Sequence, residues 1–147
     1  MIRVLVIDDT EDLRFLYRAV LTRSGYEVVE AATGHEALAM VRTDELPDVI
    51  VLDVQMPDMD GWDTLAAIRS DARCSGIPVI LCTVKSSENS VQRAWDAGCD
   101  GFLAKPFLIE ELIEELTKVL TRVKLRGGPW HDESGDVESK GRGSSEP

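Results

Sequence analysis

Five polar side chains of this sequence could act together in chemistry, and each stands at or just after the end of a short apolar run. Asp8 and Asp9 follow the first run, Asp53 ends the third, Thr83 ends the fourth, and Lys105 follows the fifth by two residues. Taken singly, each has an ordinary structural explanation, since paired acids often form turns and threonine is common at strand ends. Their recurrence at four run ends favours a shared site.

The chemistry that this set predicts is phosphoryl transfer assisted by a divalent cation. Three crowded carboxylates repel one another, which raises some of their pKa values, and a hard cation relieves that repulsion. Mg²⁺ commonly binds through one or two carboxylates while keeping several waters. Lys105 can neutralise a carboxylate and hold a phosphoryl oxygen, and Thr83 can donate its hydroxyl to the same group. The set therefore offers an attacking oxygen, a cation site and hydrogen-bond donors.

The apolar runs themselves predict a parallel β-sheet. Three of them are rich in Val, Ile and Leu without polar alternation, which is typical of strands covered on both faces. Helical patterns lie between the runs, so we expect an α/β protein with a doubly wound, five-stranded parallel sheet of the (βα)5 type. In such sheets functional residues gather at the carboxyl ends of the strands. The predicted strands are Ile2–Ile7, Glu27–Glu30, Val49–Leu52, Val79–Cys82 and Gly101–Leu103.

The helices between these strands are predicted from apolar stripes and capping residues. Thr33 and Glu36 have capping-box spacing at the start of the second helix, and Gly25 stands just past the end of the first. The last helix has the longest apolar stripe, from Ile109 to Val123. The stripe of the first helix consists of Leu13, Leu16, Tyr17, Val20 and Leu21.

Composition and charge exclude several classes of function. The net charge of −11 opposes binding to phosphate backbones, so we expect no nucleic-acid binding by this chain alone. The N-terminal apolar run Val4–Ile7 is too short for a signal peptide or a membrane span, so we expect a cytoplasmic protein with no membrane partner. The three cysteines have neither disulfide-framework nor zinc-site spacing. Residues 126–147 are polar and Gly- and Ser-rich, and we expect a disordered tail after a domain spanning residues 1–125.

Four segments of the chain resemble the signature segments of response-regulator receiver domains. They are VLVIDDTEDL, DVIVLDVQMPDMDGW, VILCTVK and AGCDGFLAKPF, which occur in the family's order within residues 2 to about 124. The resemblance, which is to chemotaxis-regulator-like single-domain receivers in particular, implies a flavodoxin-like fold with strand order 2-1-3-4-5. It also implies that Asp53 is the phosphoacceptor and that Mg²⁺ binds Asp8, Asp9, Asp53 and the backbone carbonyl of Gln55.

The same resemblance implies a switch and a set of partners. Lys105 would contact the phosphoryl group, with a cis bond before Pro106, while Thr83 and Phe102 would move when the group arrives. The phosphoryl donor would be a histidine kinase or a phosphotransfer protein of a two-component or phosphorelay system. The output would be a downstream protein bound at the face formed by the fourth helix, fifth strand and fifth helix, by a monomer or weak homodimer. No enzyme activity is expected beyond self-phosphorylation and self-dephosphorylation.

The sequence also departs from the family pattern at several positions. Val84 stands where receivers usually have Ala or Gly, and its bulk either narrows access to the acyl phosphate or is simply tolerated. Leu108 stands at the usual cap of the last helix, which predicts a weaker or differently capped start. Gln55 and Lys85 occupy positions that tune phosphoryl lifetime in receivers. For Trp95, covering the edge of the core is favoured over exposure on a partner surface.

Three other readings of the sequence stay open. The chain could be the receiver half of a longer DNA-binding transcriptional regulator, although we expect it to be complete. It could be a metal-dependent phosphatase or phosphotransferase with an aspartate nucleophile, although Gln55 stands where such enzymes commonly carry a second acid. A receiver that does not depend on phosphorylation is disfavoured because every charged site residue is present.

Overall fold

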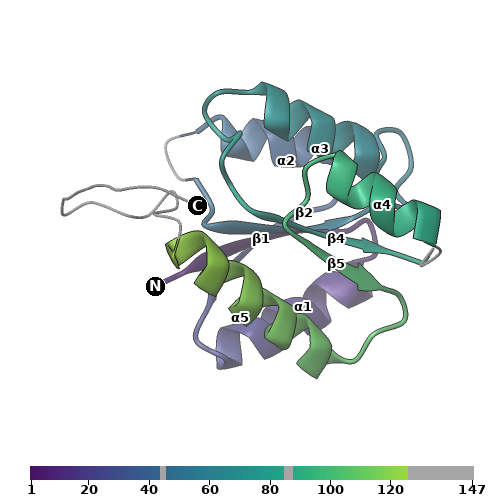
Figure 1. Ribbon diagram of the computed structural model, residues 1–147. Coiled ribbons are helices and arrows are strands. Elements are labelled where there is room, and N and C mark those ends of the chain that lie inside the picture. The colour runs from purple at the N-terminus through teal and green to yellow at the C-terminus, as the bar shows by residue number, and fades with distance from the viewer. Residues whose placement is uncertain (44–45, 85–87, 126–147) are drawn as a thin grey trace.

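A computed structural model describes residues 1–43, 46–84 and 88–125 of the chain (Figure 1). Five parallel strands form one sheet in the order β2-β1-β3-β4-β5, which confirms the expected flavodoxin-like topology. Helices α1 and α5 cover one face of the sheet, and α2, α3 and α4 cover the other (Figure 1). The strands are β1 Arg3–Ile7, β2 Glu27–Ala31, β3 Val49–Asp53, β4 Val79–Thr83 and β5 Gly101–Ala104. The helices are α1 Glu11–Arg23, α2 Gly34–Val41, α3 Gly61–Ser70, α4 Glu88–Asp96 and α5 Ile109–Leu125.

Two hydrophobic cores form because successive side chains of the central strands point to opposite faces of the sheet. In β1, Leu5 and Ile7 pack toward α2 and α3, whereas Val4 and Val6 pack toward α1 and α5. Strands β3 and β4 are buried along their whole length. Their unbroken apolar sequence, which predicted coverage on both faces, is thus explained by two helical layers.

The predicted strand ends differ from the observed ones by one residue. Strand β1 begins at Arg3 rather than Ile2, and each of the other strands runs one residue further than predicted. Asp53 and Thr83 therefore belong to the hydrogen-bonded strands β3 and β4. Asp53 pairs with Cys82 of β4 and Thr83 pairs with Ala104 of β5, so the ladder to the neighbouring strand continues through both residues.

The helix ends confirm one predicted cap and show how another is replaced. The hydroxyl of Thr33 accepts a hydrogen bond from the backbone N–H of Glu36, as expected at the start of α2. At the start of α5, Leu108 has no side-chain acceptor, and its own N–H donates to Oε1 of Glu111 at 2.7 Å. The second of the two capping alternatives is therefore correct, because the side chain three residues on supplies the cap.

Two expectations about individual apolar residues are wrong. Leu16 is 43% exposed and does not belong to the buried stripe of α1, which contains Tyr17 and Leu21. Trp95 is also 43% exposed, so it does not cover the core edge.

All three cysteines are free and buried, and burial raises the pKa of the Cys82 thiol to about 12. They serve as small core residues.

None of the helices in the described ranges is long and apolar enough to cross a membrane. The expected tail at residues 126–147 lies outside the described residues, as does Lys85.

Candidate functional site

Asp53 occupies the centre of the site because β3 is the middle strand of the sheet. The strand is apolar up to Leu52, which fixes its position between the two cores, and Asp53 ends it opposite Cys82 of β4. The Asp53 residue is only 4% exposed. A carboxylate is thereby held at the carboxyl edge of the sheet, close to the dry interior.

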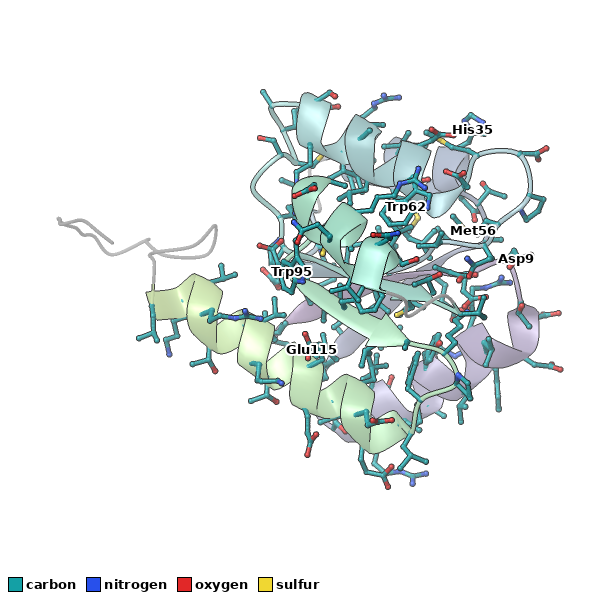
Figure 2. All side chains as sticks on the ribbon, turned by 45° about the vertical axis from the view of Figure 1, so that its right-hand side comes forward. Asp9, His35, Met56, Trp62, Trp95 and Glu115 are labelled. Carbon is teal, nitrogen blue, oxygen red and sulfur yellow. The ribbon has the colours of Figure 1, made fainter. Side chains whose placement is uncertain are left out.

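The two acids after β1 lie beside Asp53, as the sequence predicts. Asp8 is 2% exposed and Asp9 is exposed. Carboxylate oxygens of Asp8, Asp9 and Asp53 lie within 4.8 Å of one another. Figure 2 shows Asp9 at the same edge of the molecule as Met56 of the loop that follows β3.

The acidic loop after β1 is held by hydrogen bonds on both sides. Asp8 Oδ1 accepts from the N–H of Thr10, and Asp8 N–H donates to the Ala31 carbonyl at the end of β2. The Arg14 guanidinium donates to the Asp8 carbonyl at 2.7 Å and forms an ion pair with Glu30. Sequence reasoning missed Arg14, because an arginine one turn into an amphipathic helix usually lies in solvent.

Lys105, which follows the edge strand β5, neutralises the two buried acids. Its Nζ lies 2.9 Å from Asp53 Oδ1 and 3.5 Å from Asp8 Oδ2. The cis peptide bond between Lys105 and Pro106 is present as expected. A lysine that follows the edge strand β5 thus contacts carboxylates that end β3 and follow β1.

Burial and charge act in opposite directions on the pKa values of this pair. Burial raises the pKa of Asp53 above its ordinary value, although Lys105 and the Gln55 N–H lower it. Burial acts to lower the pKa of Lys105, but the hydrogen bond and charge of Asp53 outweigh it and the net shift is upward. We therefore expect Lys105 to be charged, while the Asp53 carboxylate gains from any further cation that approaches it.

These residues fit a hard divalent cation such as Mg²⁺. Three carboxylates supply only oxygen ligands, and Asp53 is a desolvated anion that a cation would stabilise. Among the described residues, this is the only group of three or more potential metal-ligating side chains. A contribution from the Gln55 carbonyl stays a prediction.

Thr83 lies at the same edge, and the side chain of Gln55 contacts it. The threonine is 1% exposed, and its Oγ1 accepts from Gln55 Nε2 at 2.9 Å. Oε1 of the same carboxamide accepts from the Val84 N–H at 3.2 Å. The sequence singled out Gln55 but did not reveal this side-chain contact, because Gln55 and Thr83 are 28 residues apart in the chain.

Phe102 and Val84 stand around the site rather than inside it. Phe102 is half-buried against the core that contains α3 and α4, and its N–H donates to Glu115 Oε2 of α5 at 3.3 Å. Val84 is 57% exposed and lines, together with Lys105 and Phe107, an apolar cavity of about 350 Å³. The proposed switch role of Phe102 and the effect of Val84 on access both stay predictions.

Comparison with known proteins agrees with this geometry. Residues 4–117 match the family model described as the response regulator receiver domain. The response regulator MprA of Mycobacterium ulcerans is 38% identical over 124 residues, which are 84% of this chain and 52% of that protein. The chain thus spans about half the length of the curated relatives that it matches.

Solved structures extend the likeness to three dimensions. The chemotaxis response regulator CheY4 of Vibrio cholerae has a TM-score of 0.76 and 36% identity, covering 81% of this chain and 98% of that one. A Francisella receiver domain, that of response regulator 1452, has a TM-score of 0.77 and 31% identity, covering 84% of this chain and 99% of that one. Sequence, fold and site geometry together show that this chain belongs to the response regulator receiver domain family.

Proposed function

We propose that the chain accepts a phosphoryl group on Asp53 from a histidine kinase or phosphotransfer protein and switches a protein-binding surface in response. The observation that carries this proposal is the convergence of Asp53, Asp8, Asp9, Lys105 and Thr83 on one sheet edge. An Asp53 carboxylate oxygen attacks phosphorus, a new O–P bond forms, and the N–P bond to the donor imidazole breaks. The product is an acyl phosphate on Asp53.

Each neighbour has a distinct part in that transfer. Lys105 moves its hydrogen bond from the carboxylate to a phosphoryl oxygen, and Thr83 donates its hydroxyl to another. Asp8 and Asp9, with Asp53, would hold Mg²⁺, which supplies positive charge for the transferring group when bound. No activity on external substrates is proposed, beyond the chain's own phosphorylation and dephosphorylation.

We place the output on the α4–β5–α5 face, in the cytoplasm, with the chain acting as a monomer or weak homodimer. Exposed Trp95 of α4 supports this assignment because tryptophans are enriched at interface anchors. It lines a cavity of about 260 Å³ with Val119 and Arg122 of α5, so both helices contribute to the surface. Figure 2 shows Trp95 beside α5 on the face that also carries Glu115.

The decisive experiment is intact-mass measurement after incubation with Mg²⁺ and a small phosphoramidate donor. We expect one added phosphoryl group on the wild type and none on Asp53→Asn. Asp58→Asn is the matched control, because it makes the same change five residues away, in the loop that follows β3. An adduct that persists on Asp53→Asn would contradict the assignment of the phosphoacceptor.

One alternative function has its own measurement. Turnover of a generic phosphate ester, abolished by Asp53→Asn, would support an aspartate-nucleophile phosphatase instead.

A second measurement concerns Val84. Val84→Ala tests whether that side chain restricts access to Asp53, with faster phosphorylation and faster phosphoryl loss expected. Unchanged rates in both directions would show that Val84 is simply tolerated.

A further inference from the structure

Arg14 of α1 joins the acidic loop after β1 to the neighbouring strand β2. Its Nη1 donates to the carbonyl oxygen of Asp8 at 2.7 Å, and its Nε lies 3.3 Å from Oε1 of Glu30. Glu30 belongs to β2 and stands opposite Val6 of β1 in the sheet. The side chains of Arg14 and Glu30 are 16% and 22% exposed, so water reaches this ion pair only in part. The guanidinium is therefore held from two sides rather than extended into solvent.

The carbonyl that Arg14 contacts belongs to the peptide unit between Asp8 and Asp9. Two other polar atoms of Asp8 also have partners, since its N–H donates to the Ala31 carbonyl and its Oδ1 accepts from the Thr10 N–H. A peptide unit is planar, so a bond that fixes the direction of its C=O also fixes the Cα that follows. Arg14 thus sets the direction in which the chain continues from the buried Asp8 to Asp9.

Asp9 depends on that peptide unit because its own side chain lacks comparable support. Its carboxylate is exposed, and no side chain within the described ranges donates a hydrogen bond to it. One of its oxygens nevertheless lies within 4.8 Å of carboxylate oxygens of Asp8 and Asp53, close enough for all three to share a cation. Removing a group that only orients a metal ligand typically lowers metal affinity by about 10- to 100-fold.

We propose that Arg14 is a positioning residue for the cation site, holding the Asp8–Asp9 peptide so that the Asp9 carboxylate faces Asp53. The inference rests on the Mg²⁺ site of the proposed function, but on none of its phosphoryl chemistry. Its sign is opposite to that of simple electrostatics. A guanidinium beside the acidic cluster repels a divalent cation, so loss of its charge alone strengthens Mg²⁺ binding. Loss of the position that it imposes on Asp9 weakens Mg²⁺ binding.

The first test is calorimetric titration with Mg²⁺ at constant ionic strength. We expect Arg14→Met to raise the Kd for Mg²⁺ about 10-fold. Arg18→Met is the matched control, because Arg18 lies one turn further along α1 and also pairs with Glu30, but makes no hydrogen bond to Asp8. This control should leave the Kd unchanged or lower it. An unchanged or lower Kd in Arg14→Met, or an equal rise in both variants, would overturn the proposal.

The second test is amide hydrogen exchange in the metal-free protein, and it shows whether the variant is folded. The Asp8 amide, bonded to the Ala31 carbonyl at 3.1 Å, should exchange about 10-fold faster in Arg14→Met, the factor of one charge-assisted hydrogen bond. The amide of Leu5, in the middle of β1, reports the opening of the whole sheet and should change less. Equal acceleration at Asp8 and Leu5 would mean that Arg14 stabilises the fold as a whole, which contradicts the proposal.

These measurements separate the inference from the proposed function. A wild type that binds no Mg²⁺ would overturn both the cation site and the role of Arg14. A wild type that binds Mg²⁺ but takes no phosphoryl group would contradict only the assignment of Asp53 as phosphoacceptor. The Kd values and the exchange rates would then still decide whether Arg14 positions Asp9.

Discussion

Asp53 is held in an environment that opposes its charge, and this has a consequence for stability. Burial raises its pKa above the ordinary value of 3.8 even though Lys105 lies 2.9 Å away. A carboxyl whose pKa is raised on folding binds its proton more tightly in the folded chain than in the unfolded chain. The free energy of unfolding therefore decreases as pH rises from 3.8 through the raised folded value. At neutral pH the ionised Asp53 destabilises the metal-free fold.

The first prediction concerns Asp53→Asn, which mimics the protonated carboxyl. In metal-free buffer at neutral pH, the variant should have a higher free energy of unfolding than the wild type, and the difference should shrink at acid pH. Lys105 keeps Asp8 as a partner at 3.5 Å, so the substitution does not leave the lysine alone. Urea unfolding at several pH values measures this, with Asp58→Asn as control. A destabilised Asp53→Asn at neutral pH would show that the ion pair outweighs burial.

The second prediction concerns Lys105→Met. Asp8 and Asp53 are 2% and 4% exposed, so removal of the ammonium leaves two buried carboxylates facing each other. Leaving a buried polar group without its partner costs about 1–3 kcal/mol, which is the expected loss in metal-free unfolding free energy. Mg²⁺ should recover part of this loss in Lys105→Met by supplying the missing positive charge. Equal stability of the variant and the wild type without metal would show that solvent reaches the acids.

The main residues of the site could be predicted from the sequence, but some of their contacts could not. Asp53, Asp8, Asp9, Thr83 and Lys105 could be predicted because each follows or ends an apolar run, and parallel strands end at one edge. Contacts made by long polar side chains could not be predicted in the same way. The carboxamide of Gln55 and the guanidinium of Arg14 reach partners through rotamers that no spacing in the sequence encodes.

At the scale of elements, the start of α5 matters because the loop before it carries Lys105. Leu108 is 67% exposed, and its N–H is accepted by Glu111 rather than by a side chain at the cap itself. The helix begins with half of a capping box, since the acid three residues on is present but the usual hydroxyl or carboxamide is not. Substitutions at this helix N-terminus can therefore either raise or lower the free energy of unfolding.

The third prediction follows from this half-formed cap. Leu108→Ser should raise the free energy of unfolding by about 0.5–2 kcal/mol, because a hydroxyl there can accept from a backbone N–H in the first turn of α5. Glu111→Ala should lower it by about 1 kcal/mol by leaving the Leu108 N–H without its acceptor. Glu110→Ala is the matched control, since it removes the same charge from the same helix turn without touching the cap. Thermal and urea unfolding measure all three, and equal effects at Glu110 and Glu111 would indicate helix-dipole electrostatics instead.

Element boundaries and surface residues were harder to predict than element identity, for a physical reason. Periodicity finds the stripe that faces the sheet but not its edges, so the predicted stripe includes Leu16, which lies at the margin and is exposed. For Trp95, the sequence favours a position at the edge of the core. In the structure Ala94 takes the buried position beside it, which turns the tryptophan toward α5 and solvent.

Across the whole molecule, the excess of acidic residues and the carboxylates of the site both add negative charge, which disfavours the fold when no cation is bound. The chain has a net charge of −11, and three of its carboxylates lie close together at the ends of β1 and β3, so negative potential is concentrated there. At 0.1 M, salt screens the repulsion between charges that are more than about 10 Å apart. The repulsion among the carboxylates of the cluster acts over shorter distances and is screened less. Monovalent salt and a divalent cation should therefore stabilise the fold by separable amounts.

The fourth prediction is that Mg²⁺ raises the melting temperature beyond the effect of matched ionic strength. A ligand that binds only the folded state stabilises it by mass action, about 2.7 kcal/mol at a hundredfold excess over its Kd. NaCl at equal ionic strength reports screening alone, and the difference between the two salts isolates the site. Asp9→Asn should reduce that difference while leaving the NaCl effect intact, because Asp9 is exposed and would supply a ligand without supporting the core. If Mg²⁺ and NaCl shift the melting temperature equally, the three carboxylates contribute to the overall charge but do not form a cation site.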